Sequence, residues 1–131
     1  MKEILEFLKA SGVFYLATVE GDQPRVRPFG AVCEWENKLY LITGNGKSVY
    51  AQITANPKVE ISSMTPDGRW LRLTAEAIRD DRREARTAML NANPDLRGMY
   101  SEDDGVMEVL YLQNAQAVIC SFTAEPVEYR F

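Results

Sequence analysis

Residues 25–55 read RVRPFGAVCEWENKLYLITGNGKSVYAQITA, a run in which strand-forming residues give way to glycines and then to a helical segment. The β-branched and aromatic residues of 25–35 and 39–43 predict two strands joined by a short turn. Pro28 has no backbone N–H, so it predicts an edge strand, a bulge or a break in the first of them. The stretch therefore predicts antiparallel β-structure, followed by a glycine-rich turn and a short helix over 48–55.

The sequence on both sides continues this pattern. Short turns with Gly, Pro, Asn or Asp separate most of the apolar runs, which favours antiparallel connections. Further strands are predicted over 13–19, 59–64, 69–78, 106–112, 117–123 and, at an edge, 127–131; helices are predicted over 2–10 and from the caps Asp80 and Asp81 to Leu90. We therefore expect a mainly β fold of six or seven antiparallel strands with a few helices, in which closing the sheet into a barrel would remove its exposed edges.

The composition bounds the number of domains and the class of partner. With 131 residues and no repeat or linker, the chain is expected to form one domain over residues 1–131. Hydrophobic residues make up 46% and charged residues 26%, as in soluble globular domains. The net charge of −4 disfavours general binding to nucleic acid or to anionic membranes, although a local basic cluster can still bind a small anion.

Missing residue types exclude several kinds of site. The chain has no histidine, which excludes a Ser-His-Asp triad, a Cys-His dyad and every zinc site that needs histidine. Cys33 and Cys120 are too few for a structural zinc centre, and two isolated thiols are typical of a reducing compartment. There is no signal-peptide pattern and no apolar run near the roughly 20 residues of a membrane span. We expect a cytoplasmic protein without a metal site, and the sequence leaves its catalytic residues unknown.

Two basic segments have the chemistry to bind a phosphate group. Lys47 and Ser48 follow two glycines at a helix start, where free backbone amides favour an anion; a glycine-rich turn capped by Ser48 is the alternative. Arg25 and Arg27 lie two positions apart on a predicted strand and so point to one side, either as a phosphate grip or as a solvated strand face. Trp70 either stacks on a flat ligand ring or belongs to the core.

The succession of these segments resembles the pyridoxamine 5′-phosphate oxidase-like family, and most of all its small members related to general stress proteins. The segments that carry the resemblance are PRVRPFG (24–30), TGNGKS (43–48), ANPKVEI (55–61) and RWLRLTAEA (69–77), and it spans nearly the whole chain. The resemblance implies a split β-barrel that binds FMN. It also implies a homodimer with two flavin sites at the subunit interface.

The resemblance assigns residues to the flavin by position. It implies that Arg27, Lys47 and Ser48 meet the FMN phosphate and that the backbone of 28–30 runs along the flavin ring. The full set of implied cofactor-binding residues is Arg25, Arg27, Pro28, Phe29, Gly30, Ile42, Thr43, Lys47, Ser48, Val49, Gln52 and Trp70.

The implied activity is that of an oxidoreductase that passes electrons between a reduced nicotinamide donor, NADH or NADPH, and a small flat acceptor. Pyridoxamine 5′-phosphate oxidase itself places Arg and His residues of a C-terminal segment on its substrate. This chain ends at Phe131 and has no histidine, so the vitamin-phosphate reaction is not expected. Three alternatives stay open: a non-catalytic flavin carrier or stress-related sensor, a deazaflavin-binding relative, and a small barrel that binds single-stranded nucleic acid, which the net charge disfavours.

Overall fold

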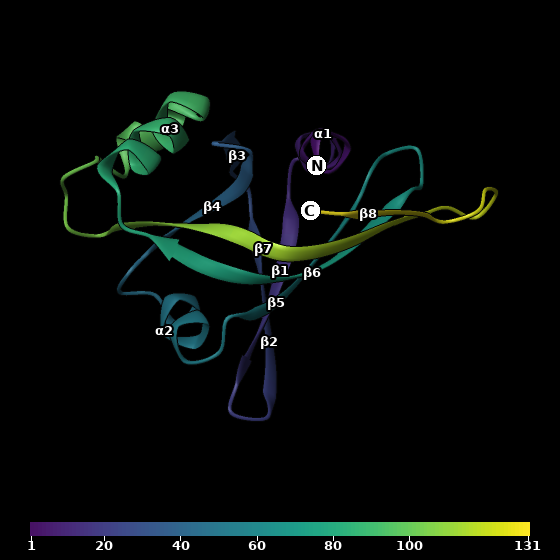
Figure 1. Cartoon of the computed structure of the whole chain (residues 1–131), viewed down its shortest axis with the longest axis horizontal. Coiled ribbons are helices and arrows are strands. Elements are labelled where there is room, and N and C mark those ends of the chain that lie inside the picture. Colours follow the sequence, from purple (N-terminus) through teal and green to yellow (C-terminus); the bar gives the residue numbers. More distant parts are fainter.

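Eight strands form one antiparallel sheet in a computed structural model that describes residues 1–131 (Figure 1). The mainly β fold expected from the sequence is confirmed, with eight strands. In chain order the elements are α1 (Lys2–Ser11), β1 (Phe14–Glu20), β2 (Gln23–Phe29), β3 (Val32–Trp35), β4 (Lys38–Gly44), α2 (Ser48–Ala55), β5 (Lys58–Met64), β6 (Trp70–Asp80), α3 (Arg83–Ala92), the 3₁₀ helix η1 (Pro94–Gly98), β7 (Met107–Cys120) and β8 (Val127–Arg130).

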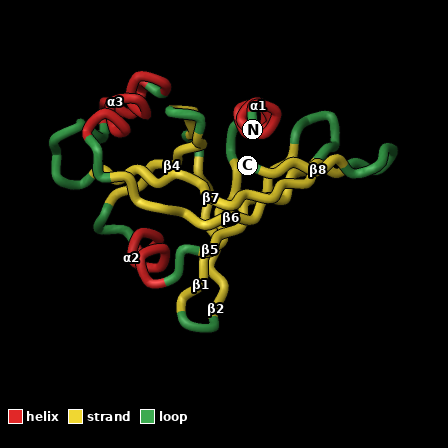
Figure 2. Tube along the Cα trace, in the orientation of Figure 1, coloured by secondary structure: helices red, strands yellow, loops and turns green.

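The sheet is coiled but not closed, as in a split barrel. Its strand order is β2-β1-β5-β6-β7-β4-β3, and β8 pairs with the far half of β7 (Figure 2). The strands β2 and β3 are therefore the two ends of the path. Pro28 lies in the edge strand β2, as its missing donor predicts, and the single predicted strand over 25–35 is interrupted at Gly30 and Ala31.

Two hydrophobic clusters lie on opposite faces of the strands near β4. The larger contains 21 buried residues and joins α1 and α2 to the inner face of the sheet. The smaller contains eight and joins α3 to the other face of β3, β4 and β7. Because Leu39 and Leu41 face the first cluster and Tyr40 and Ile42 the second, β4 is buried on both faces. This explains its unbroken apolar run, where a strand with one solvated face would alternate.

Three local predictions differ from the structure. The segments 106–112 and 117–123 form one long strand, β7, in which Asn114 at φ 53° produces a bulge without ending the pairing with β6. Asp80 belongs to β6 and does not cap α3, whose N-cap is Arg82; the Asp80 carboxylate accepts a bond from the Arg82 backbone N–H instead. The segment after Asn93, for which no helix is predicted, forms η1.

None of the helices is long and apolar enough to cross a membrane. Cys33 is buried, Cys120 is half-buried, and the two thiols are not joined.

Candidate functional site

A cavity of about 660 Å³ lies between two walls that are distant in the sequence. One wall comes from β2, the end of β4 and the start of α2, and the other comes from the end of α3 and from η1. Sixteen residues line the cavity: Arg27, Pro28, Phe29, Gly30, Ala31, Ile42, Thr43, Lys47, Val49, Ala92, Asn93, Pro94, Asp95, Leu96, Met99 and Tyr100. Its size is within the range of small-molecule sites in proteins, about 300–1,000 Å³.

Arg27 lines the first wall, and part of its guanidinium group is already hydrogen-bonded to other residues of the chain. Its Nη1 donates to the backbone oxygen of Leu16 (3.1 Å) and to Thr18 Oγ1 (2.8 Å), and its Nη2 donates to Gln52 Oε1 (2.6 Å). A guanidinium has five N–H donors, so the Nε–H and one Nη2–H have no partner on the chain. These two nitrogens form the side-on edge through which arginine binds a phosphate or a carboxylate with two parallel bonds.

The groups behind Arg27 fix its position. Thr18 is 2% exposed and Gln52 6% exposed, and Thr18 Oγ1 donates to Gln52 Oε1 at 2.5 Å. Gln52 Nε2 in turn donates to Glu20 (3.4 Å). Because Thr18 lies on β1 and Gln52 on α2, the arginine is held between two elements, and side-chain hydrogen bonds of this kind keep a charged group in one orientation.

Arg27 also carries an uncompensated positive charge. Most arginines of the chain form ion pairs, including Arg25 with Glu20 at 2.9 Å, but Arg27 has no carboxylate within ion-pair distance. Burial and the neighbouring Arg25 charge lower the pKa of Arg27, although an arginine keeps its charge in any ordinary range. An anion in the cavity would supply the missing counter-charge.

The turn between β4 and α2 adds further donors to the same wall. Lys47 lines the cavity without an ion-pair partner, and it is the N-cap of α2 without a side-chain capping bond. The backbone N–H groups of Ser48 and Val49 have no acceptor within the chain. The start of α2 therefore offers free amides and the positive end of its dipole, the arrangement that favours anions at helix N-termini.

A close approach between loops positions this turn. A Cβ atom at Gly44 would lie 3.4 Å from Val106 and 3.5 Å from the Tyr100 hydroxyl, which is ordinary van der Waals contact, so the turn lies directly against these two residues. Asn45 is bound to the neighbouring loop through its backbone N–H, which donates to Val106 (2.9 Å), and through Nδ2, which donates to Gly105 (2.8 Å). The 101–106 loop thus fixes the position of this turn, and α3 fixes the position of the loop.

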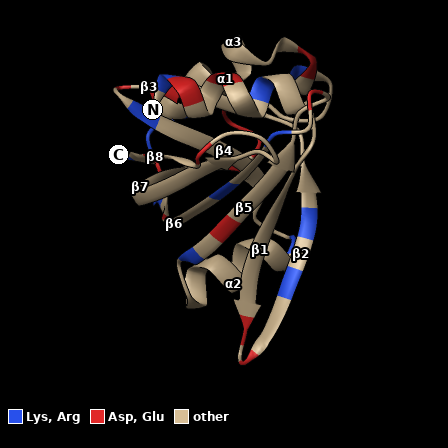
Figure 3. Cartoon of the chain, turned by 90° about the vertical axis from the view of Figure 1, so that its right-hand side faces the viewer, with Lys and Arg blue, Asp and Glu red and all other residues tan.

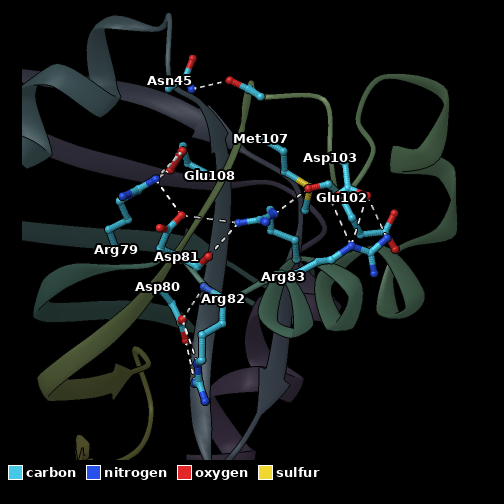
Figure 4. Close-up of polar contacts among 12 residues, drawn as sticks. Asn45, Arg79, Asp80, Asp81, Arg82, Arg83, Glu102, Asp103, Met107 and Glu108 are labelled. Carbon is cyan, nitrogen blue, oxygen red and sulfur yellow. Dashed lines mark hydrogen bonds and ion pairs between the residues drawn. The ribbon is translucent and has the colours of Figure 1, made fainter.

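Ion pairs tie that loop to α3 and tie the start of β7 to the end of β6, as Figure 4 shows. Arg79 binds the buried Glu108 at 2.6 Å and Arg83 binds Asp103 at 3.0 Å. The hydrogen bonds that Arg79 donates to Glu108 raise the pKa of Arg79 above its usual range, and those that Arg83 donates to Asp103 lower the pKa of Asp103. These contacts give the second cavity wall a defined position relative to the first.

Eight of the sequence-predicted cofactor residues line this cavity: Arg27, Pro28, Phe29, Gly30, Ile42, Thr43, Lys47 and Val49. Gln52 lies behind Arg27, Ser48 starts α2 beside Lys47, and Arg25 is turned to Glu20. Figure 3 shows the basic residues of β2 on one exposed strand. Trp70 does not line the cavity. It lies at the start of β6, where its ring contacts that of Phe122 in a tilted arrangement, with 5.0 Å between the ring centroids.

Sequence reasoning missed the second wall altogether. It contains Asn93, Pro94, Asp95, Leu96, Met99 and Tyr100, which come from a segment for which the sequence predicted no helix or strand. The only local signal was Pro94, which stands at the first turn of η1, where a proline is well accommodated.

Comparisons with known proteins agree with this fold. The family model described as pyridoxamine 5′-phosphate oxidase matches residues 1–113. The chain is 55% identical to a NimC/NimA family protein from Clostridium acetobutylicum, with a TM-score of 0.99, and the match covers 100% of this chain and 92% of that one. No match was found among curated proteins.

Two more distant structures share the architecture. General Stress Protein 26 from Bacillus anthracis str. Sterne matches with a TM-score of 0.77 at 15% identity, covering 99% of this chain and 97% of that one. An FMN-binding protein from Nostoc punctiforme PCC 73102, described as pyridoxamine 5′-phosphate oxidase-related, matches with a TM-score of 0.68 at 16% identity, covering 99% and 95%. At these identities the likeness establishes the fold.

Proposed function

This chain belongs to the pyridoxamine 5′-phosphate oxidase family, and from that premise we propose that it binds FMN in the cavity beside Arg27 and acts as an FMN-dependent oxidoreductase. The observation that carries the proposal is the free side-on edge of the Arg27 guanidinium, which has no carboxylate partner and lies in a cavity wall. The FMN-binding relative with the same fold supports the choice of cofactor.

The residues of the first wall fit the parts of FMN. The phosphate needs charged and neutral donors, which Arg27, Lys47 and the free amides at Ser48 and Val49 provide. The ring needs apolar surface, and the side chains of Phe29 and Ile42 supply it. When bound, FMN supplies two-electron chemistry between a reduced nicotinamide donor and a small flat acceptor, while the protein binds and orients the reactants.

We propose a homodimer, because one face of the sheet is uncovered and partly apolar. Tyr15 on β1 and Val26 on β2 are 50% and 67% exposed and point to the same face, on which no helix packs. A groove of about 460 Å³ runs across that face between β1, β2, β5 and β6. A second copy on this face would bury these residues. The unjoined thiols support a cytoplasmic location.

The absorption spectrum of the protein purified without added cofactor tests the proposal. Heat-released FMN at about one per chain, or stoichiometric uptake of added FMN, is the expected result. Reduction of the bound flavin by NADH or NADPH without oxygen would support the oxidoreductase. A flavin that stays oxidised would favour a carrier or sensor. A protein that takes up only a deazaflavin or haem would overturn the choice of FMN.

A further inference from the structure

The wall formed by the end of α3 and by η1 has no part in the phosphate site. It faces the donor wall across the same cavity and contributes seven lining residues, among them Asn93, Asp95 and Met99. A site for the FMN phosphate alone does not account for the polar side chains of Asn93 and Asp95.

The polar groups of this wall are acceptors that lack partners. Asn93 Nδ2 donates to the backbone oxygens of Val32 (3.2 Å) and Met89 (3.3 Å), and these bonds fix the side chain and leave Oδ1 without a partner. The Asp95 carboxylate has no hydrogen bond and no ion pair. The neighbouring carboxylates differ, because Glu102 and Asp103 are both bound by arginines.

The two walls therefore have opposite chemistry. The first presents unused donors and positive charge at Arg27 and Lys47, and the second presents unused acceptors and negative charge at Asp95. A phosphate is attracted to the first wall and repelled by the second. A ligand group at the second wall must bring hydrogen-bond donors and must not be an anion.

The surface between these acceptors is apolar. Leu96 packs on the smaller hydrophobic cluster, and Met99 is 72% exposed beside the cavity that it lines. A large exposed thioether at a cavity edge provides an adaptable contact for an aromatic ring.

We propose that the η1 wall, with the free acceptors of Asp95 and Asn93, is the binding site of a second ligand: an uncharged or cationic aromatic molecule that carries an N–H donor. The site selects against carboxylates and phosphates. The inference rests on the proposed function only for the occupant of the other wall, FMN, beside which the second ligand would be the small flat electron acceptor.

Three pyridines of nearly equal shape provide the test: nicotinamide, which is neutral with an N–H donor; 1-methylnicotinamide, which is a cation with the same donor; and nicotinate, which is an anion without it. Calorimetric titration of FMN-loaded protein is expected to show affinity falling in the order cation, neutral, anion. In Asp95→Asn the affinity for 1-methylnicotinamide should fall about tenfold, and nicotinate should bind more tightly.

Glu125→Gln is the matched control, because it removes the same charge at an exposed position in the β7–β8 connection, at the opposite end of the molecule from α3 (Figure 1). The proposal is overturned if none of the pyridines binds, if all three bind alike, or if Asp95→Asn and Glu125→Gln behave alike. If the protein takes up no FMN, the proposed function fails separately. The same titrations on the protein as purified then decide the η1 wall alone.

Discussion

Arg25 and Arg27 lie two positions apart on one strand but have different partners. Arg25 is neutralised by Glu20 on the surface, and Arg27 keeps a free edge toward the cavity. In Arg27→Ala the loss of charge-assisted bonds worth about 1.5–3 kcal/mol should lower FMN affinity about ten- to a hundredfold. Riboflavin, which lacks the phosphate, should bind as before. Fluorescence titration measures both, and Arg25→Ala should leave both affinities nearly unchanged. Equal FMN binding by folded Arg27→Ala would remove Arg27 from the phosphate site.

Thr18 is expected to act through Arg27 as a positioning residue. Thr18→Val keeps the shape but removes the hydroxyl that accepts from Arg27 and donates to Gln52. FMN affinity should fall by about threefold to tenfold, while riboflavin affinity stays constant, and Thr18→Ser should restore FMN binding. A parallel loss of FMN and riboflavin binding would show that Thr18 only supports the fold.

The sequence was sufficient to place Arg25 and Arg27 on one side of a strand, because side-chain direction follows from the two-residue period. The sequence did not show how many N–H donors of Arg27 are free to bind a ligand. That number depends on Thr18 and Gln52, which lie 9 and 25 positions away and are brought together by the packing of α2 on β1. Local patterns predict which residue types form the site, and tertiary contacts determine which of their hydrogen-bonding groups are free to bind a ligand.

At the scale of elements, Asp80 links the end of β6 to the β3–β4 hairpin. Its carboxylate accepts bonds from the Tyr40 hydroxyl (2.7 Å) and from Arg82 (2.9 Å), and Arg82 also binds Glu36 in the hairpin turn. The Arg82 bonds lower the pKa of Asp80 well below its usual range, while burial and the Asp80 charge raise the pKa of Tyr40. The folded state therefore favours the Asp80 carboxylate.

This carboxylate gives stability a defined dependence on pH. Because the pKa of Asp80 is lower in the folded chain, its contribution is complete above the unfolded value of about 3.9 and is lost as the pH falls below it. Asp80→Asn should destabilise the protein by about 2 kcal/mol at pH 7, and the difference from the parent should shrink toward pH 3. Urea unfolding at both pH values measures this. Asp81→Asn, at an exposed ion pair, should cost less than about 1 kcal/mol; a similar loss in both variants would contradict the assignment.

Elements with strong local signals were predicted well, and the others were not. The helix over 48–55 matches α2, because a glycine-rich turn and an Asn-Pro pair bound it. The strand β7 was divided in two, because Asn114 is read locally as a turn although its partner β6 continues beside it. The helix η1 has only Pro94 as a local signal, so the sequence did not predict the cavity wall that η1 and the end of α3 form.

For the whole molecule, the uncovered sheet face predicts self-association. Val26→Asp places a charge on that face, so the variant should sediment as a monomer where the parent is a dimer. Val127→Asp is the control, because Val127 pairs with Ile119 on the other face of the sheet. A parent protein that is monomeric at micromolar concentration would contradict the dimer.

The sequence predicted the antiparallel architecture and the family, because strand periods and turn residues are local and the order of segments is specific. It could not show that β4 is buried on both faces or that α3 forms a second cluster with Cys33, Tyr40 and Met89. Those facts depend on which segments meet after the chain has coiled.

Because Cys33 lies in that second cluster, the reactivity of its thiol reports how often α3 separates from the sheet. Burial raises the pKa of Cys33 to about 11, whereas Cys120 is half-buried. An alkylating reagent needs a thiolate, so it should modify Cys120 directly and Cys33 only when α3 lifts from β3 and β4. The ratio of the two labelling rates, followed by mass spectrometry, would thus measure how often the wall that carries η1 detaches from the sheet, and whether a bound ligand slows that detachment.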